Sequence, residues 1–222
     1  MAVLLRIENQ PTLRDQVASR LRTSIIEGAL KPGTRLVERE LCEQLGVSRP
    51  SVREAMRQLE NEGLITNLPN RGPIVVVLSE KAAAEIYEVR SALEGLAARL
   101  FALNASDGAM AEIKQCCDML VATPKDAPAS DYLALKDQFY AILLKGAGNE
   151  VLSHMSGMAL RRFYQLRNIS VAKTGRAEES RKEVKRIVDA LLARNGDAAE
   201  KACIEHVQNT AKAVFQALEN DL

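Results

Sequence analysis

The spacing of apolar residues predicts a chain that is mostly helical. Apolar side chains recur at intervals of three and four residues, as in Leu13, Val17, Leu21 and Ile25. This interval places them on one face of a helix, where they can pack against a core. The pattern predicts helices over Leu13–Glu27, Glu38–Leu45, Glu80–Leu103, Asp107–Val121, Asp131–Lys145, Glu150–Ile169, Ala177–Arg194 and Ala198–Leu218.

A further short helix and a hairpin are predicted directly after Glu38–Leu45. Gly46 can adopt the left-handed conformation that ends a helix, and Ser48 followed by Pro50 suits the start of the next one. The apolar stripe of this second helix consists of Val52, Ala55, Met56 and Leu59. Apolar runs at Leu64–Thr66 and Ile74–Val77 then flank a turn-forming segment and predict a two-stranded wing.

Arginines define a basic arc on this second helix. Arg49, Arg53 and Arg57 recur at every fourth position beside the apolar stripe. A short helix, a tight turn and a helix with a basic N-terminal end are typical of motifs that enter the major groove of DNA. The alternative is a solvated basic face that binds nothing. We favour DNA binding because the helix caps, the arginines and the following hairpin all agree with it.

Three segments resemble the winged helix-turn-helix of GntR-type bacterial transcription regulators. They are Glu38-Arg39-Glu40-Leu41, the run from Gly46 to Ala55, and the run from Leu59 to Ile65. The resemblance implies that the partner is double-stranded operator DNA, and it assigns DNA contacts to Arg39, Arg49 and Arg53 and to the wing tip at Asn70, Arg71 and Gly72.

The position of Arg49 in the first helical turn makes it the expected bidentate contact to guanine. Ser48, Ser51 and the backbone N–H groups at the same helix end would hold phosphates.

The length of 222 residues allows two modest domains, which we expect at residues 1–78 and 79–222, because Ser79 can cap a long helix. No apolar run approaches the roughly 20 residues of a membrane span, and Met1–Pro11 does not resemble a secretory signal. We therefore expect a cytoplasmic protein without a membrane partner. The four cysteines lack a metal-finger spacing, and buried thiols are the simplest interpretation.

The net charge of +1 is low for a protein that binds nucleic acid. Residues 1–78 contain 11 Lys and Arg against 9 Asp and Glu, and the remainder contains 19 against 20. Affinity for DNA must therefore depend on where the arginines lie, and formation of a homodimer would double the phosphate contacts.

The second half is expected to form an antiparallel all-helical bundle of about six helices, because short connections join the predicted helices. It also resembles the FCD ligand-binding domain of the FadR subfamily of GntR regulators. The residues that carry this resemblance are Glu88-Val89-Arg90, Leu93-Glu94, Phe139, Asn149, Ile187 to Leu191, Gly196-Asp197, Ala202 and His206. The resemblance implies a domain that binds a small effector and dimerises.

Members of that subfamily often hold a divalent metal through one Asp and three His. The corresponding positions here are Lys136, Tyr140, Val184 and His206. One imidazole with these neighbours cannot supply the three or four donors of a metal site, so we expect neither a metal nor another cofactor. The alternative is a realigned metal site that uses Asp137 and His206.

Interior cations instead predict a site for a small organic anion, such as a carboxylate. Arg90 and Arg162 share helix faces with apolar residues, and Lys136 stands where the resemblance implies an acidic metal ligand. Tyr140, His206 and Asn209 complete the predicted set. Buried charges need partners, which an anion would provide. The alternative is that Arg90 pairs with Glu94, Lys136 reaches solvent and His206 is an ordinary core residue.

These observations predict a homodimeric transcription factor that responds to an effector. An enzyme is the rival from another class, but no set of nucleophile, base and orienting group is visible in the sequence. A second rival is a constitutive DNA-binding dimer whose helical domain no longer senses a ligand.

Overall fold

The computed structural model describes residues 12–124, 127–157 and 176–220. The chain divides into two compact units, Met1–Val77 and Leu78–Leu222, so that the division falls one residue before the predicted one. Among the described residues, none of the helices combines the length and the apolar composition that crossing a membrane requires.

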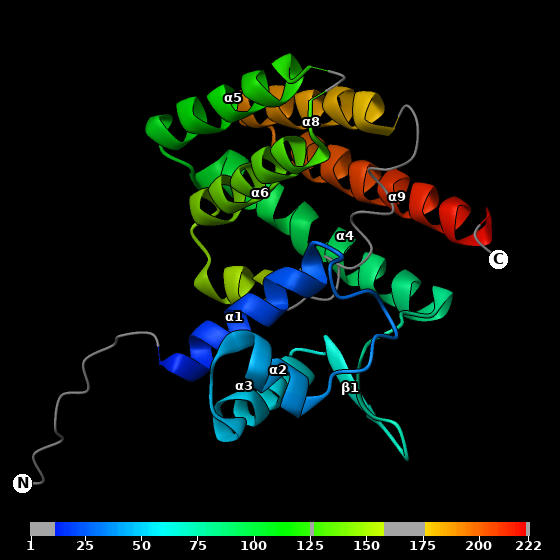
Figure 1. The fold of residues 1–222 in the computed structure, drawn as a ribbon. Coiled ribbons are helices and arrows are strands. Elements are labelled where there is room, and N and C mark those ends of the chain that lie inside the picture. The colour runs from blue at the N-terminus through cyan, green and yellow to red at the C-terminus, as the bar shows by residue number, and fades with distance from the viewer. Residues whose placement is uncertain (1–11, 125–126, 158–175, 221–222) are drawn as a thin grey trace, which may run out of the picture. The chain divides into compact units, whose positions relative to one another are not determined.

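The first unit consists of three helices and a hairpin in the described part. In chain order these are α1 (Leu13–Ile26), α2 (Glu38–Leu45), α3 (Arg49–Asn61), β1 (Ile65–Leu68) and β2 (Gly72–Val75) (Figure 1). A capping box is present at the start of α1, because the side chains of Thr12 and Asp15 bond each other's backbone N–H groups. The apolar stripes of α1 and α3 meet in one core, which the inner face of the hairpin covers.

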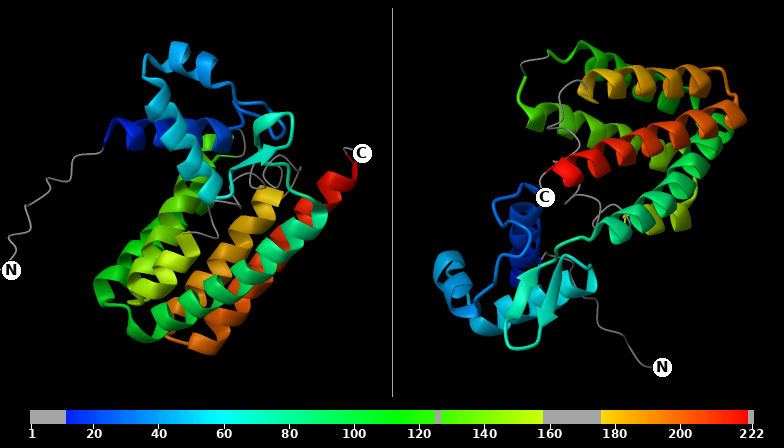
Figure 2. Two further views of the ribbon diagram at one scale, coloured as in Figure 1. Left: turned by 90° about the horizontal axis from the view of Figure 1, so that it is seen from below. Right: turned by 90° about the vertical axis from the view of Figure 1, so that its right-hand side faces the viewer.

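The second unit consists of helices and short connections in its described residues. Its elements are α4 (Glu80–Asn104), α5 (Asp107–Ala122), α6 (Ala129–Gly146), a helical stretch at residues 150–157, α8 (Arg176–Leu192) and α9 (Gly196–Asn220). Figure 2 shows α9 lying along both α4 and α8. The large side chains at the centre of the core include Phe101, Phe139 and Ile187. The rest of the predicted helix Glu150–Ile169 lies outside the described residues.

The predicted fold class is confirmed, but the wing differs from the prediction. The sequence suggested short strands around a seven-residue loop, whereas Asn67 and Leu68 belong to β1, and Gly72 and Pro73 belong to β2. The turn between them is tight because Asn70 adopts a positive φ of 64°, which Asn tolerates better than most residues. The wing is therefore a longer hairpin with a shorter turn than the sequence indicated.

Packing of α6 against α4 depends on the absence of a side chain at Gly146, the last residue of α6. A Cβ atom there would overlap the buried ring of Phe101. We predict that Gly146→Ala lowers the free energy of unfolding by about 1–3 kcal/mol, because a close-packed core must shift to admit the methyl group.

Denaturant unfolding measures this effect, with Gly108→Ala in α5 as the matched control. A Cβ at Gly108 would meet no heavy atom nearer than 3.8 Å. Equal stability of the two variants would contradict the packing argument.

Candidate functional site

The turn between α2 and α3 exposes the arginine-bearing face of α3. Gly46 ends α2 with a positive φ of 64°, and Ser48 occupies the N-cap of α3 with an extended backbone. Arg49 is the first residue of α3. Because the apolar stripe of α3 faces the core, Arg49, Arg53 and Arg57 are all exposed.

The three arginines of α3 differ in the hydrogen bonds and ion pairs that they form with other residues. Arg53 donates two hydrogen bonds to the carboxylate of Glu38, at 3.1 and 3.0 Å, and this bonding lowers the pKa of Glu38. Arg57 pairs with Glu54 at 2.7 Å. Arg49 forms no hydrogen bond or ion pair with any residue in the described ranges. All five of its N–H donors therefore remain available to an external acceptor.

The side chain of Ser48 does not cap α3, contrary to the prediction. Its hydroxyl lies 3.0 Å from the hydroxyl of Ser51 and makes no hydrogen bond to the helix backbone. The backbone N–H groups of the first turn therefore lack a side-chain acceptor, and such N–H groups commonly bind anions.

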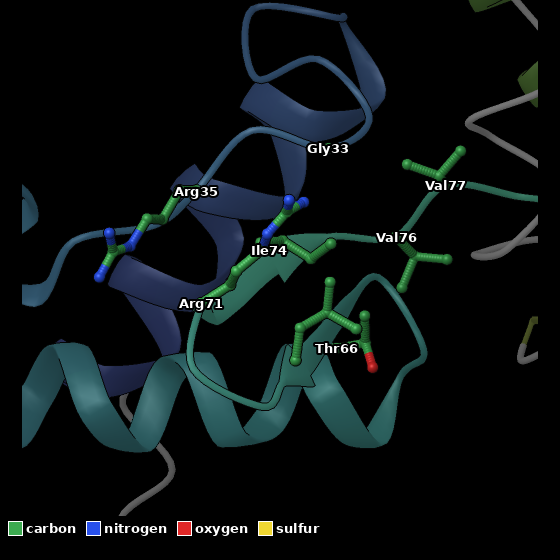
Figure 3. A pocket seen from close by; sticks show the side chains of 8 residues that line it. Gly33, Arg35, Thr66, Arg71, Ile74, Val76 and Val77 are labelled. Atoms are coloured by element: carbon green, nitrogen blue, oxygen red, sulfur yellow. The ribbon is translucent and has the colours of Figure 1, made fainter.

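The wing adds two exposed arginines beside an apolar surface. Arg71 lies in the turn between Asn70 and Gly72. Arg35 lies in the segment that precedes α2, and the backbone of this segment forms hydrogen bonds with β2. Arg35, Arg71 and Ile74 are among the residues that line a hollow of about 750 Å³, and Figure 3 shows their side chains. The sequence analysis missed Arg35, because only the pairing of its segment with β2 brings it beside the wing.

Arg39, the remaining predicted DNA contact, is 73% exposed on α2. Its closest approach to Glu43 is 3.9 Å, which is the distance of a weak surface pair. Its side chain is thus accessible to a ligand outside the protein.

In the second unit, three helices contribute to a chain of buried polar contacts. The Lys136 Nζ of α6 lies 2.7 Å from His206 Nε2 on α9, and His206 Nδ1 lies 2.6 Å from Glu183 Oε2 on α8. His206 and Glu183 are buried, and Lys136 is half-buried. The structure thus brings two predicted residues, Lys136 and His206, into direct contact, and it adds the carboxylate of Glu183, which the sequence analysis did not single out.

Protonation fixes the direction of these hydrogen bonds. Burial, reinforced by the nearby Lys136 ammonium, lowers the pKa of His206 to about 3, so the ring is neutral at pH 7. Burial alone would raise the pKa of Glu183, but hydrogen bonds from His206 and Arg176 outweigh it and lower the pKa to about 2. Glu183 can then only accept, so Nδ1 of His206 carries the proton and Nε2 accepts from Lys136.

Three further residues surround Glu183. Arg176 donates to Glu183 Oε2 at 2.7 Å and to the hydroxyl of Thr210 at 2.8 Å, and Asn209 donates to Glu183 Oε1 at 2.9 Å. Asn209 was predicted, whereas Arg176 and Glu183 were missed. A signal for Glu183 existed, because it lies four residues before Ile187 on the buried stripe of α8.

Arg90 is held by an ion pair in the interior of the bundle. Its guanidinium contacts Glu94 Oε1 at 2.7 Å, as the alternative interpretation of the sequence suggested. The interior thus contains acids as well as cations, since Glu94 and Glu183 are both buried there. Arg162, the third predicted cation, lies outside the described residues.

Tyr140 lies between these two groups of charges. The Lys136 ammonium is 5.2 Å from the centre of its ring, and burial, with the Glu94 carboxylate nearby, raises the pKa of Tyr140 well above 10. The buried hydroxyl of Tyr140 and Oε2 of Glu94 each lack a hydrogen-bond partner of ordinary geometry in the described part of the chain. Such atoms indicate where a water or a ligand group would bind.

These residues do not fit a metal ion. Both ring nitrogens of His206 are engaged, one by Glu183 and one by a cationic Lys136. Asp137, which the realigned site would need, is exposed. Among the residues that the structure describes, no group of three or more His, Cys, Asp and Glu is placed to hold a metal.

The neutral state of buried His206 predicts a pH dependence of stability. In the unfolded chain the imidazole of His206 has a pKa of 6.5 and binds a proton below that pH. In the folded chain it binds this proton only near pH 3. Acidification therefore favours unfolding. From pH 6.5 to 5 the loss due to His206 is about 2 kcal/mol, at about 1.4 kcal/mol per pH unit. Glu183 adds nothing in this window, because its contribution is lost only below about pH 4.5.

Urea unfolding at pH 7.5, 6.5 and 5 tests this expectation. Over this range the free energy of unfolding of His206→Gln should fall by about 2 kcal/mol less than that of the wild type. His154→Gln is the control, because His154 is exposed and is the only other histidine. The attribution to His206 is refuted if both variants retain the wild-type pH dependence.

Comparison with known proteins agrees with both units. Residues 13–75 match the family of bacterial regulatory proteins named gntR, and residues 85–209 match the FCD domain. The chain is 28% identical over 205 residues to the uncharacterized HTH-type transcriptional regulator YdhC of Bacillus subtilis (strain 168), with 92% of each protein covered. It is 26% identical over 216 residues to the HTH-type transcriptional repressor RspR of Escherichia coli (strain K12), covering 97% of this chain and 95% of RspR.

Among solved structures, E. coli McbR/YncC has a similar fold. The TM-score is 0.80 at 23% sequence identity, and the match covers 93% of this chain and 99% of that one. Both resemblances inferred from the sequence are confirmed. Because the FCD match alone spans more than half of the chain and the gntR match covers its helix-turn-helix, the protein belongs to the GntR family of bacterial transcriptional regulators, as a member with an FCD domain.

Proposed function

We propose that the protein is a homodimeric repressor that binds a two-fold-symmetric operator. A small organic anion controls its affinity for this operator. The observation that carries the DNA-binding part is Arg49, an exposed arginine without a protein partner in the described ranges, at the N-terminal end of α3. Repression is favoured because the relative RspR is named a repressor.

Each DNA-facing residue has a role that follows from its position. Arg49 reads a guanine with two hydrogen bonds, while Ser48, Ser51 and the N–H groups of the first turn of α3 hold a phosphate. Arg39 and Arg53 contact the DNA on either side, with Arg53 oriented by Glu38.

The wing tip, formed by Asn70, Arg71 and Gly72, follows the adjacent groove. Arg35, beside Arg71, adds a phosphate contact to this set.

The proposed effector site is the buried cluster around Lys136. Arg90, Lys136 and Arg176 bring three cationic side chains to the cluster, which also contains the carboxylates of Glu94 and Glu183. A carboxylate of the effector would be attracted to the ammonium of Lys136, because charges interact strongly in a region of low dielectric.

The groups near Lys136 indicate what else the effector would carry. Tyr140 and Glu94 offer a buried hydroxyl and a buried carboxylate oxygen that make no hydrogen bond of ordinary geometry in the described part, although the two groups interact with each other. A carboxylate that also bears a hydroxyl or amino group would satisfy both atoms. His206 and Asn209 complete the site by positioning Lys136 and Glu183.

Selection of binding sites from random double-stranded DNA tests the DNA-binding proposal. We expect enrichment of one short sequence with two-fold symmetry, because a single compact reading head supplies little affinity alone. Recovery of an asymmetric half-site, or of no sequence, would contradict the proposal.

The variant Arg49→Ala should lose sequence discrimination. We expect a cost of about 1–3 kcal/mol on the selected operator and a relaxed base preference at one position in each half-site. Arg57→Ala is the control that removes the same charge from the same helix, and it should weaken binding to all sequences alike. If Arg49→Ala also weakens all sequences alike, Arg49 contacts only phosphate.

Thermal unfolding with a panel of metabolite carboxylates tests the effector site. At least one acid should raise the melting temperature of the wild type, because a ligand that binds only the folded state stabilises it. The stabilisation should disappear in Lys136→Met and persist in Lys114→Met, which removes an exposed lysine from α5. A wild type that no acid stabilises, or a Lys136→Met variant that responds normally, would leave the constitutive dimer as the better account.

A further inference from the structure

Arg53 of α3 is held by a carboxylate that comes from a different helix. Its Nε and Nη2 atoms donate to the two oxygens of Glu38, the first residue of α2, at 3.1 and 3.0 Å. The side chains of Arg53 and Glu38 are 56% and 32% exposed. An ion pair that is largely exposed contributes little to stability, so its main effect here is to fix the orientation of the guanidinium.

This orientation leaves the other edge of the guanidinium available. Of the five N–H donors of Arg53, Glu38 takes the one on Nε and one on Nη2. The remaining donors include one on each Nη atom, and these two form a second fork at the end of the side chain. In the described part of the chain they form no hydrogen bond. Such a fork matches O6 and N7 of guanine, so Arg53 can bind Glu38 and a guanine at the same time.

The charge of Glu38 makes Arg53 a poor ligand for phosphate. Hydrogen bonds from Arg53 lower the pKa of Glu38, and the positive charges of Arg53 and Arg49 lower it further, so the carboxylate is ionised at neutral pH. An ionised carboxylate repels the DNA backbone and offsets the charge of Arg53. A residue that reads a base instead benefits from this carboxylate, because a side chain fixed in advance loses less entropy on binding.

We propose that Arg53 is a second base-reading residue, specific for guanine, and that Glu38 is the positioning residue that determines this specificity. The inference rests on the proposed function, because it assigns roles within the DNA-binding face. It adds a second guanine contact in each half-site to the contact of Arg49. The alternative is that Glu38 only links α2 to α3.

The variant Glu38→Gln tests the role of the carboxylate, because it removes the charge and one acceptor oxygen but keeps the size of the side chain. Selection from random DNA by the wild type should give two strongly preferred guanines in each half-site. With Glu38→Gln, the preference for one of them should fall by about tenfold or more. Binding to unrelated DNA should tighten and depend more steeply on salt, because Arg53 can then contact phosphate.

The variant Arg53→Lys identifies the arginine on which Glu38 acts. Lysine keeps the charge but lacks the fork, so this variant should relax the same base position as Glu38→Gln. The double variant should show no further loss of preference, because the two residues act as a unit.

Glu54→Gln is the matched control, because Glu54 pairs with Arg57 through a single hydrogen bond of 2.7 Å on α3. It removes the same charge and should tighten binding to all sequences without a change in base preference.

The outcomes separate this inference from the proposed function. A wild type that selects no DNA sequence would remove the proposed function and the inference with it. A wild type that selects an operator, together with a Glu38→Gln variant that keeps the full base preference, would remove the role of Glu38 alone. A Glu38→Gln variant that weakens all sequences alike and melts at a lower temperature would show that Glu38 only links the two helices. Relaxation of different positions by Glu38→Gln and Arg53→Lys would also contradict the inference.

Discussion

The carboxylate of Glu183 is the charge around which the bundle interior is organised. It accepts hydrogen bonds from Arg176 at the start of its own helix and from His206 and Asn209 on α9. Through His206 it also fixes Lys136 of α6. Removing a single partner from such a network leaves the remaining charges buried and uncompensated, which costs more than the lost bond itself. The relative placement of α6, α8 and α9 therefore depends on one buried anion.

This network gives the interior a defined electrostatic character. Because His206 is neutral and donates to Glu183, its second nitrogen can only accept, and it holds the ammonium of Lys136 in place. The cation is thereby held in a defined position by side chains of the protein. A preorganised cation loses less entropy when it binds an anion than a flexible surface lysine would. The same rigidity would transmit the presence of a ligand to all three helices.

The sequence predicted most accurately those features that depend on residues close to one another in the chain. The helix-turn-helix was predictable because Gly46, the apolar stripe of α3 and the arginine spacing act within a few residues of one another. The wing was less predictable, since the positive φ of Asn70, together with that of Gly72, shortened the turn. The pairing of Arg90 with Glu94 was visible as an i, i+4 spacing.

The cluster around Glu183 could not be assembled from the sequence. Arg176 and Thr210 are 34 positions apart, and Lys136 and His206 are 70 apart. Only the packing of α6, α8 and α9 brings them together. A buried acid on an apolar stripe, such as Glu183, indicates that the carboxylate has a polar or cationic partner, but the sequence does not identify that partner. Arg35 was missed for the same reason, because its neighbour Arg71 is distant in sequence.

The central claim is that the anion site and the DNA-binding face are coupled. The most direct test measures the dissociation constant of the wild type for its selected operator with and without the stabilising acid, at fixed salt. The account predicts a change of about 5- to 150-fold, which corresponds to a coupling free energy of roughly 1–3 kcal/mol. It also predicts that operator DNA changes the affinity for the acid by the same factor, because the linkage is reciprocal. An acid that binds the bundle but leaves the affinity for DNA unchanged would contradict the account.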